Sequence, residues 1–95
     1  MSEKVLLEVE DATLPFYTYE EGGVSYIEFD ASQSSPPEPM VNVMKGFELI
    51  AGSDKRLVMI NAHEPAPLYP RIADSVTWEV EVLDSGDVKI VFTNR

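Results

Sequence analysis

The sequence predicts an α+β protein, a two-layer α/β sandwich with a mixed sheet, and three observations lead to this fold class. Residues 40–50 have the spacing of an amphipathic helix. They lie between two β-forming segments, residues 24–30 and 57–60, and a strand–helix–strand unit of this kind forms a right-handed parallel crossover. Residues 77–92 alternate as an antiparallel hairpin does. The predicted order is therefore β-α-β-α-β-β, preceded by an extra N-terminal β segment.

The N-terminal part predicts a strand and a hairpin. Residues 4–10 alternate apolar with charged side chains, which is typical of a half-buried strand. Residues 16–30 place β-forming residues on both sides of Gly22 and Gly23, which readily take the positive φ angles of a tight turn. The side chains expected to face one another here are Tyr17 and Tyr19 on one strand and Val24 and Tyr26 on the other. A loosely ordered leader over residues 1–22 is the alternative.

The central helix is predicted from apolar residues at three- and four-residue spacings, with polar residues on the other side. The apolar set is Met40, Val43, Met44, Phe47 and Ile50, and the polar set is Asn42, Lys45 and Glu48. Ser35 and Glu38 have the spacing of a capping box. Gly46 inside the helix indicates close approach to a strand, and Gly52 suits the stop of the helix.

The second half predicts a central strand and a closing hairpin. Residues 57–60 are apolar without alternation, as in a strand covered on both faces. Because one helix covers only one face, a second layer is expected from the N-terminal segment or from another subunit. Residues 67–75 predict a short helix or turn limited by prolines. The final hairpin turns at Ser85 and Gly86. Its expected core residues are Trp78, Val80 and Val82.

Composition and charge exclude several functional classes. With 95 residues, 44% of them hydrophobic, the chain predicts one small globular domain. The lack of cysteine excludes disulfides, thiolate metal sites, persulfide carriage and cysteine nucleophiles, and it fits a reducing compartment. The net charge of -10 repels phosphate backbones, so no nucleic-acid partner is expected. The sequence shows no signal peptide or membrane-spanning stretch, and we expect a cytoplasmic protein.

The acidic residues are concentrated near the N-terminus, where residues 1–30 hold eight carboxylates and one basic residue, Lys4. Two interpretations are open. Such a face can simply be solvated and solubilising, or it can dock a basic protein partner.

Three segments together suggest a family: "FDASQSSPPEPM", "RLVMINAHEPAPLYPRI" and "TWEVEVLDSGDVKIVF". They resemble the TusA/SirA-like domain superfamily, and more closely its cysteine-less, uncharacterised bacterial branch, a domain-of-unknown-function family. The resemblance implies a domain over residues 24–95, with residues 1–23 as a strand or hairpin extension. Sulfur carriers of the superfamily have Cys-Pro-x-Pro at the start of the first helix, and the matching residues here are Pro36, Pro37, Glu38 and Pro39.

Pro36 therefore stands where the resemblance places the sulfur-bearing cysteine. Proline has neither a nucleophile nor a metal ligand, so sulfur transfer by that mechanism is chemically unavailable. Prolines in the first turn also remove the free backbone N–H groups that bind anions. The cluster indicates a rigid start of the helix, not a phosphate cradle.

Two loops form the candidate site. If the strands at residues 24–30 and 57–60 are parallel, their C-terminal ends share an edge, where open α/β sheets bind ligands. These loops contribute hydroxyls, acids, a base and a cation. The ligand-binding candidates are Asp30, Ser35, Glu38, His63, Glu64, Tyr69 and Arg71, with Ser32 beside them. Alternatively, His63 and Tyr69 only pin a proline-stiffened loop through hydrogen bonds.

The function expected from these features is a non-catalytic accessory module that binds a small molecule or a protein. His63 is the only histidine and there is no cysteine, so we expect no metal site and no cofactor. One alternative is a small acid–base hydrolase that uses His63 with Ser35 and a carboxylate, Asp30 or Glu64. Another is a docking partner in sulfur relay that carries no sulfur. The chain is expected to be a monomer or a weak homodimer through an open sheet face.

Overall fold

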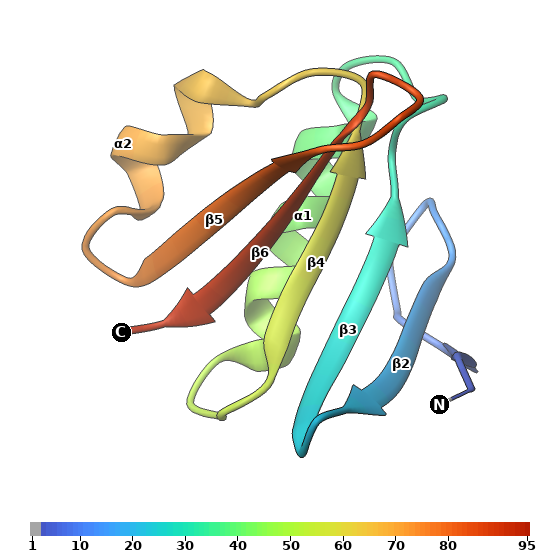
Figure 1. The fold of residues 1–95 in the computed structure, drawn as a ribbon, viewed down its shortest axis with the longest axis vertical. Helices are drawn as coiled ribbons and strands as arrows, with labels where there is room; N and C mark the ends of the chain where they lie inside the picture. The colour runs from blue at the N-terminus through green and yellow to red at the C-terminus, as the bar shows by residue number, and fades with distance from the viewer. Residues whose placement is uncertain (1–2) are drawn as a thin grey trace.

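A six-stranded mixed sheet with one long helix packed on one face forms the protein, as the computed structural model of residues 3–95 shows (Figure 1). The strands are β1 (Val5–Leu7), β2 (Phe16–Glu21), β3 (Val24–Asp30), β4 (Arg56–Asn61), β5 (Val76–Val82) and β6 (Val88–Asn94). The helices are α1 (Glu38–Ile50), the 3-10 turn η1 (Ala66–Leu68) and α2 (Tyr69–Ile72). In the sheet order β1-β2-β3-β4-β6-β5, only β3 and β4 are parallel. The predicted fold class and element order are confirmed.

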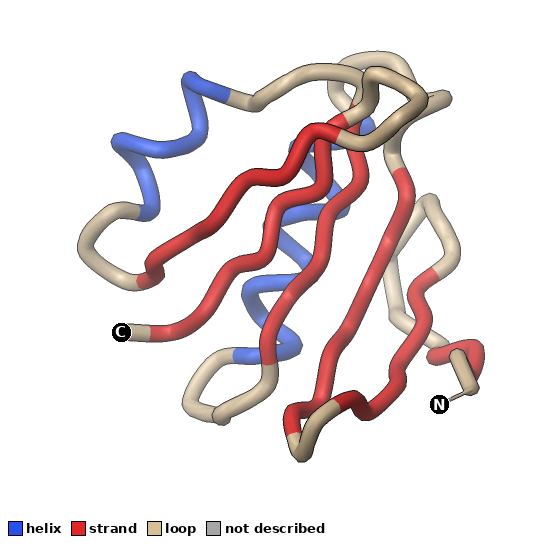
Figure 2. The backbone as a smooth tube through the Cα atoms, in the orientation of Figure 1, coloured by secondary structure: helices blue, strands red, loops and turns tan. Residues whose placement is uncertain are grey.

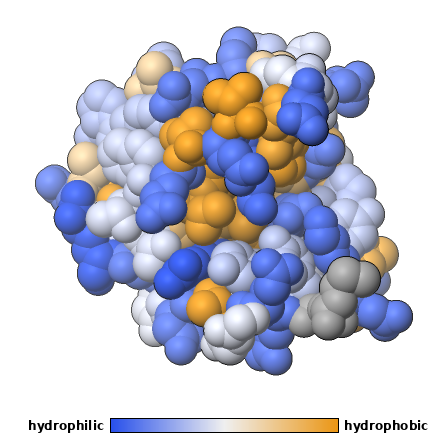
Figure 3. Space-filling model, viewed as in Figure 1, coloured by the Kyte–Doolittle hydropathy of each residue, from blue (hydrophilic) through white to orange (hydrophobic). Residues whose placement is uncertain are grey.

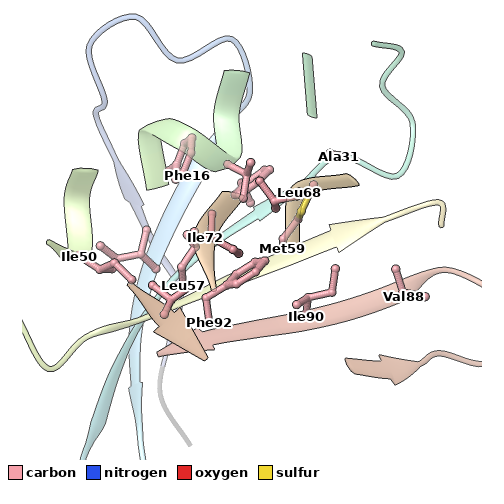
Figure 4. Packing of buried hydrophobic residues seen from close by; sticks show 14 residues of the cluster. Phe16, Ala31, Ile50, Leu57, Met59, Leu68, Ile72, Val88, Ile90 and Phe92 are labelled. Carbon is pink, nitrogen blue, oxygen red and sulfur yellow. The ribbon is translucent and has the colours of Figure 1, made fainter. Parts of the chain in front are cut away.

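The core lies between the sheet and α1. Successive side chains of a strand point to opposite faces, so alternate residues of every long strand are directed toward the helix. Phe16 on β2 packs against Phe29 on β3 with ring centroids 5.0 Å apart, and Phe47 on α1 meets Phe92 on β6 edge to face. Figure 4 shows how β2, β4, β6 and the short helices contribute to the same cluster. Segments from both ends of the chain therefore share one core.

Helix α1 begins without the predicted capping box. Its N-cap is Pro37, which makes no side-chain cap bond, and the helix starts at Glu38. Two prolines separate Ser35 from the helix, so Ser35 contributes only its backbone carbonyl, which accepts a 3.0 Å hydrogen bond from the Glu38 N–H. The end of the helix is as predicted, because Gly52 follows it with a φ of 72°.

Two side chains of α1 differ from the prediction: Met44, expected on the apolar face, is 41% exposed, and Asn42 is buried. Asn42 was expected on the polar face, but it is fully buried. The loop between β1 and β2 crosses the helix at this point and provides hydrogen-bond partners at Thr13 and Leu14. A helical period identifies the face of a residue, but not whether a distant loop covers that face.

The predicted close approach at Gly46 is confirmed. A Cβ atom added there would lie 2.5 and 2.6 Å from the two methyl carbons of Leu57 on β4. Because both distances are shorter than van der Waals contact, any Cβ here would force the Leu57 side chain to move, and glycine lets α1 sit this close to the sheet without that shift.

The N-terminal segment extends the sheet at its β3 edge and does not cover the face opposite α1. Its first strand is shorter than the predicted residues 4–10, and the hairpin at Gly22 and Gly23 forms with both φ angles positive. Across that hairpin Tyr19 faces Tyr26 as predicted, but Tyr17 faces Glu28 and Val24 faces Glu21. The division at residue 23 into an extension and a domain stays a prediction, and its first two residues lie outside the described part of the chain.

The sheet face opposite α1 carries no second layer from residues 3–95. In the view of Figure 1 the helix lies behind the sheet, and Figure 3 shows on the near face an apolar patch bordered by hydrophilic side chains. By strand alternation Val58, Ile60 and Val91 point to this face. Val58 is nevertheless fully buried, so side chains within the sheet are sufficient to cover it.

The predicted inward residues of β5 are only partly enclosed. Trp78 stacks on Tyr69 of α2, with ring centroids 4.4 Å apart, but Val82 is 71% exposed. The prediction for Val82 was wrong because the short α2 covers only the first part of β5. No helix within residues 3–95 has the length and apolarity needed to cross a membrane.

Candidate functional site

The candidate site lies at the edge where the parallel strands β3 and β4 end. Their register runs from Tyr26 opposite Arg56 to Asp30 opposite Ile60, and the Ala31 N–H continues the ladder with a 2.7 Å bond to the Ile60 carbonyl. Figure 2 shows the loops that follow both strands gathered at this end of the sheet. The predicted shared edge is therefore formed.

A cavity of about 220 Å³ opens between these loops. Its walls come from the start of α1, the end of β4 and the segment that leads into η1. The lining residues are Ser34, Pro36, Pro37, Pro39, Met40, Val43, Met59, Asn61, Ala62, His63, Pro65 and Leu68. None of these carries a carboxylate, an ammonium or a guanidinium group, and most of the wall is apolar. The prolines build the wall of a hollow in addition to starting the helix.

Most of the predicted site residues lie outside this cavity. His63 lines it, and its side chain is exposed at the mouth. The Asp30 side chain forms a hydrogen bond within its own loop, because its Oδ1 accepts a 2.8 Å hydrogen bond from the Ser32 N–H. Ser35 is exposed, and Glu38 forms the first residue of α1. The structure thus brings the two predicted loops together but does not direct their charged groups to one point.

Glu64 and Tyr69 form a pair beside the cavity. The Tyr69 hydroxyl donates a 2.8 Å hydrogen bond to the Glu64 Oε1. Burial raises the pKa of Tyr69 well above its usual value, and the hydrogen bond and negative charge of Glu64 add to this effect. Tyr69 therefore pins its loop as the hydrogen-bonding interpretation predicts, whereas the His63 side chain, expected to do the same, makes no hydrogen bond within residues 3–95. Arg71 is exposed and forms no ion pair with any of residues 3–95.

No catalytic arrangement around His63 is formed among the described residues. The imidazole makes no hydrogen bond to any of residues 3–95, so neither Ser35 nor a carboxylate orients it. The same residues contain no group of three or more His, Asp or Glu side chains placed to hold a metal ion.

Asn61 is a cavity residue that the site prediction omitted. It is only 4% exposed, and its Nδ2 donates a 2.9 Å hydrogen bond to the carbonyl of His63. The sequence did contain a signal for it. A period of two from Leu57 through Met59 places residue 61 on the helix-facing side of β4, so a polar residue there points into the core.

The comparisons with known proteins give one family. A family model described as "Uncharacterized conserved protein (DUF2249)" matches residues 28–94, which include the cavity and every strand from the end of β3 onward. No curated protein and no solved structure matches the chain. Since the matched residues make up well over half of the sequence, the chain belongs to the DUF2249 family of uncharacterised conserved proteins.

Proposed function

We propose that this protein is a non-catalytic binding module of the cytoplasm whose ligand site is the apolar cavity at the β3–β4 edge. The observation that supports this is the cavity itself: a preformed hollow with apolar walls at the strand edge where α/β sheets bind ligands. Its ligand is a small molecule that is mainly apolar.

The size of the cavity limits the ligand. A cavity of roughly 150 Å³ with apolar walls is enough to bind benzene. The cavity here has about 220 Å³, so it has room for a single ring with a short substituent. Larger cofactors, which occupy pockets of about 300–1,000 Å³, would extend beyond it.

The walls are stiff before any ligand arrives. Pro36, Pro37, Pro39 and Pro65 all contribute to the lining, and each ring fixes one backbone angle. A rigid site loses little conformational freedom on binding, which favours affinity for a small ligand.

The resemblance to TusA/SirA-like domains supports the same proposal. Pro36 matches the position of the sulfur-bearing cysteine in that superfamily, and here it lines the cavity. We propose that the scaffold has kept a site at this end of the helix while exchanging a reactive group for an apolar wall. Sulfur transfer has no chemical group to proceed through at this position.

The experiment is a titration of the ¹⁵N-labelled protein with separate panels of neutral aromatic fragments, metabolite anions and zinc. We expect the neutral fragments to shift backbone amides around the cavity, in residues 34–43 and 59–68. Ala62 lies exposed on the lining, so Ala62→Trp should block these shifts. Ala51→Trp, at the exposed far end of α1, is the matched control and should leave them unchanged.

Two results would contradict the proposal. One is a response to anions or zinc but not to neutral fragments. The other is a set of shifts centred on the sheet face opposite α1, which would indicate protein docking instead.

A further inference from the structure

The cavity wall contains one enclosed polar side chain with an unused hydrogen-bonding atom. Asn61 is 4% exposed, whereas Ser34 is half-buried and His63 is exposed. The Asn61 Nδ2 donates a hydrogen bond to the carbonyl of His63. Because only the nitrogen of a side-chain amide can donate, this bond fixes the orientation of the Asn61 side chain. The other atom, Oδ1, is therefore an acceptor held in a defined position.

No group within residues 3–95 donates to this oxygen. Asn42, the other buried asparagine, uses its amide oxygen and nitrogen fully, with two bonds to each. For Asn61 only the bond from Nδ2 is formed. No fully enclosed side-chain oxygen or nitrogen in the described residues is left without a partner, so the Asn61 Oδ1 keeps some accessible surface. Because Asn61 lines the cavity and is otherwise buried, this surface belongs to the cavity.

We infer that the ligand is an uncharged molecule with a ring-sized apolar body and an N–H or O–H group that donates to the Asn61 Oδ1. This inference rests on the proposed function and specifies its ligand class: primary or secondary amides, phenols and alcohols. The apolar body lies against Met40, Met59 and Leu68, and the donor points to the end of β4.

The ligand is uncharged because the enclosed part of the lining offers no ionic partner, and His63, the one ionisable lining residue, is exposed at the mouth. Burying an unpaired charge among apolar side chains is far more costly than burying an amide or hydroxyl that finds a hydrogen bond. The donor then determines selectivity. A site with a buried acceptor rejects an analogue that lacks the donor, because the acceptor would be left without water and without a partner.

The test uses benzamide and acetophenone as probes of the full chain. They have nearly the same shape and share a carbonyl, but the amide nitrogen of benzamide is a methyl group in acetophenone. Benzamide is also better hydrated, so the informative quantity is the ratio of the two dissociation constants, compared between the wild type and Asn61→Leu. We expect the ratio that measures the preference for benzamide to fall about five- to tenfold in the variant. This factor corresponds to the free energy of one hydrogen bond.

A direct signal in the wild type makes the test independent of the stability of the variant. At saturation both aromatic rings shift the side-chain amide resonance of Asn61, and the shift should be clearly larger with benzamide, because only benzamide donates a hydrogen bond to the Asn61 Oδ1. The corresponding resonance of Asn94 is an internal control, because its Nδ2 bonds the carbonyls of Ile50 and Ser53 at the other end of α1.

The outcomes separate this inference from the proposed function. If both probes shift the cavity amides equally, and Asn61→Leu leaves their ratio unchanged, the donor inference is wrong and the apolar site stands. If neither probe shifts the cavity amides at millimolar concentration, both are wrong.

Discussion

The Asn42 side chain joins α1 to the loop that precedes β2. Its Oδ1 accepts hydrogen bonds from the N–H groups of Thr13 and Leu14, at 3.1 and 3.2 Å. Its Nδ2 donates to the Thr13 hydroxyl and to the Glu38 carbonyl, both at 2.8 Å. Three of these bonds join α1 to residues that are 28 and 29 positions earlier in the chain, and the bond to Glu38 stays within the helix.

We predict that Asn42→Ala lowers the free energy of unfolding by about 2–4 kcal/mol, since two part-buried backbone N–H groups lose their acceptor and a buried amide is removed. Urea denaturation followed by the fluorescence of Trp78 measures this change. Gln33→Ala is the control, because Gln33 is exposed and its side chain makes no hydrogen bond within residues 3–95. A loss as small as that of the control would mean that water replaces the amide at no cost.

The Tyr69–Glu64 pair predicts a pH dependence at the alkaline end. Burial and the neighbouring carboxylate raise the pKa of Tyr69 in the folded protein, whereas in the unfolded chain the pKa of tyrosine is about 10. The unfolded state therefore loses this proton first. The stabilisation is complete below pH about 10 and declines as the pH rises from there toward the folded pKa.

The measurement is the free energy of unfolding against pH, with Tyr69→Phe as the comparison. We expect the stability of the wild type to fall more steeply above pH about 10 than that of the variant. Absorbance of tyrosinate should show one fewer late-titrating group in the variant. Equal slopes would show that the hydroxyl is not coupled to folding.

At the scale of elements, the contact between α1 and β4 depends on a missing side chain. We predict that Gly46→Ala destabilises the protein by about 1–2 kcal/mol, because overpacking against Leu57 exceeds the gain of roughly 1 kcal/mol in helix propensity. In a Leu57→Ala background the obstructing methyl groups are absent, and the same change should become stabilising. A double-mutant cycle from urea denaturation measures both effects. Destabilisation of equal size in both backgrounds would place the cause outside the Leu57 contact.

The elements themselves could be predicted from local pattern, whereas the cavity could not. The parallel crossover of β3, α1 and β4 follows from periodicity and from the rule of right-handed connections. Asn42 and Val82 were misplaced because their burial depends on a distant loop and on the short length of α2. For the same reason the predicted site named charged loop residues. The apolar hollow arises only when the prolines of one loop face Met59 and Leu68 from other elements.

At the scale of the whole molecule, residues 3–23 contribute to the sheet and to the core. Phe16 is 1% exposed and packs against Phe29, and β2 pairs with β3 from Val24 to Phe29. The family match begins only at residue 28, so the part of the chain outside it still completes the sheet and satisfies Asn42. The structure of residues 3–23 therefore predicts one cooperative folding unit, not a domain with a detachable leader.

A deletion tests this prediction. A chain of residues 24–95 lacks Phe16. The loss of this buried side chain alone lowers the free energy of unfolding by about 3–5 kcal/mol, which is a large part of the stability of a small domain. We expect this chain to be largely unfolded, or to self-associate through the exposed edge of β3, as shown by its ¹⁵N spectrum and by sedimentation. The control lacks only residues 1–4 and loses the exposed Lys4–Glu28 ion pair. Its free energy of unfolding should differ from that of the full chain by about 1 kcal/mol or less. If residues 24–95 prove as stable as the full chain, β1 and β2 are an independent addition, and the cavity belongs to a domain that folds without them.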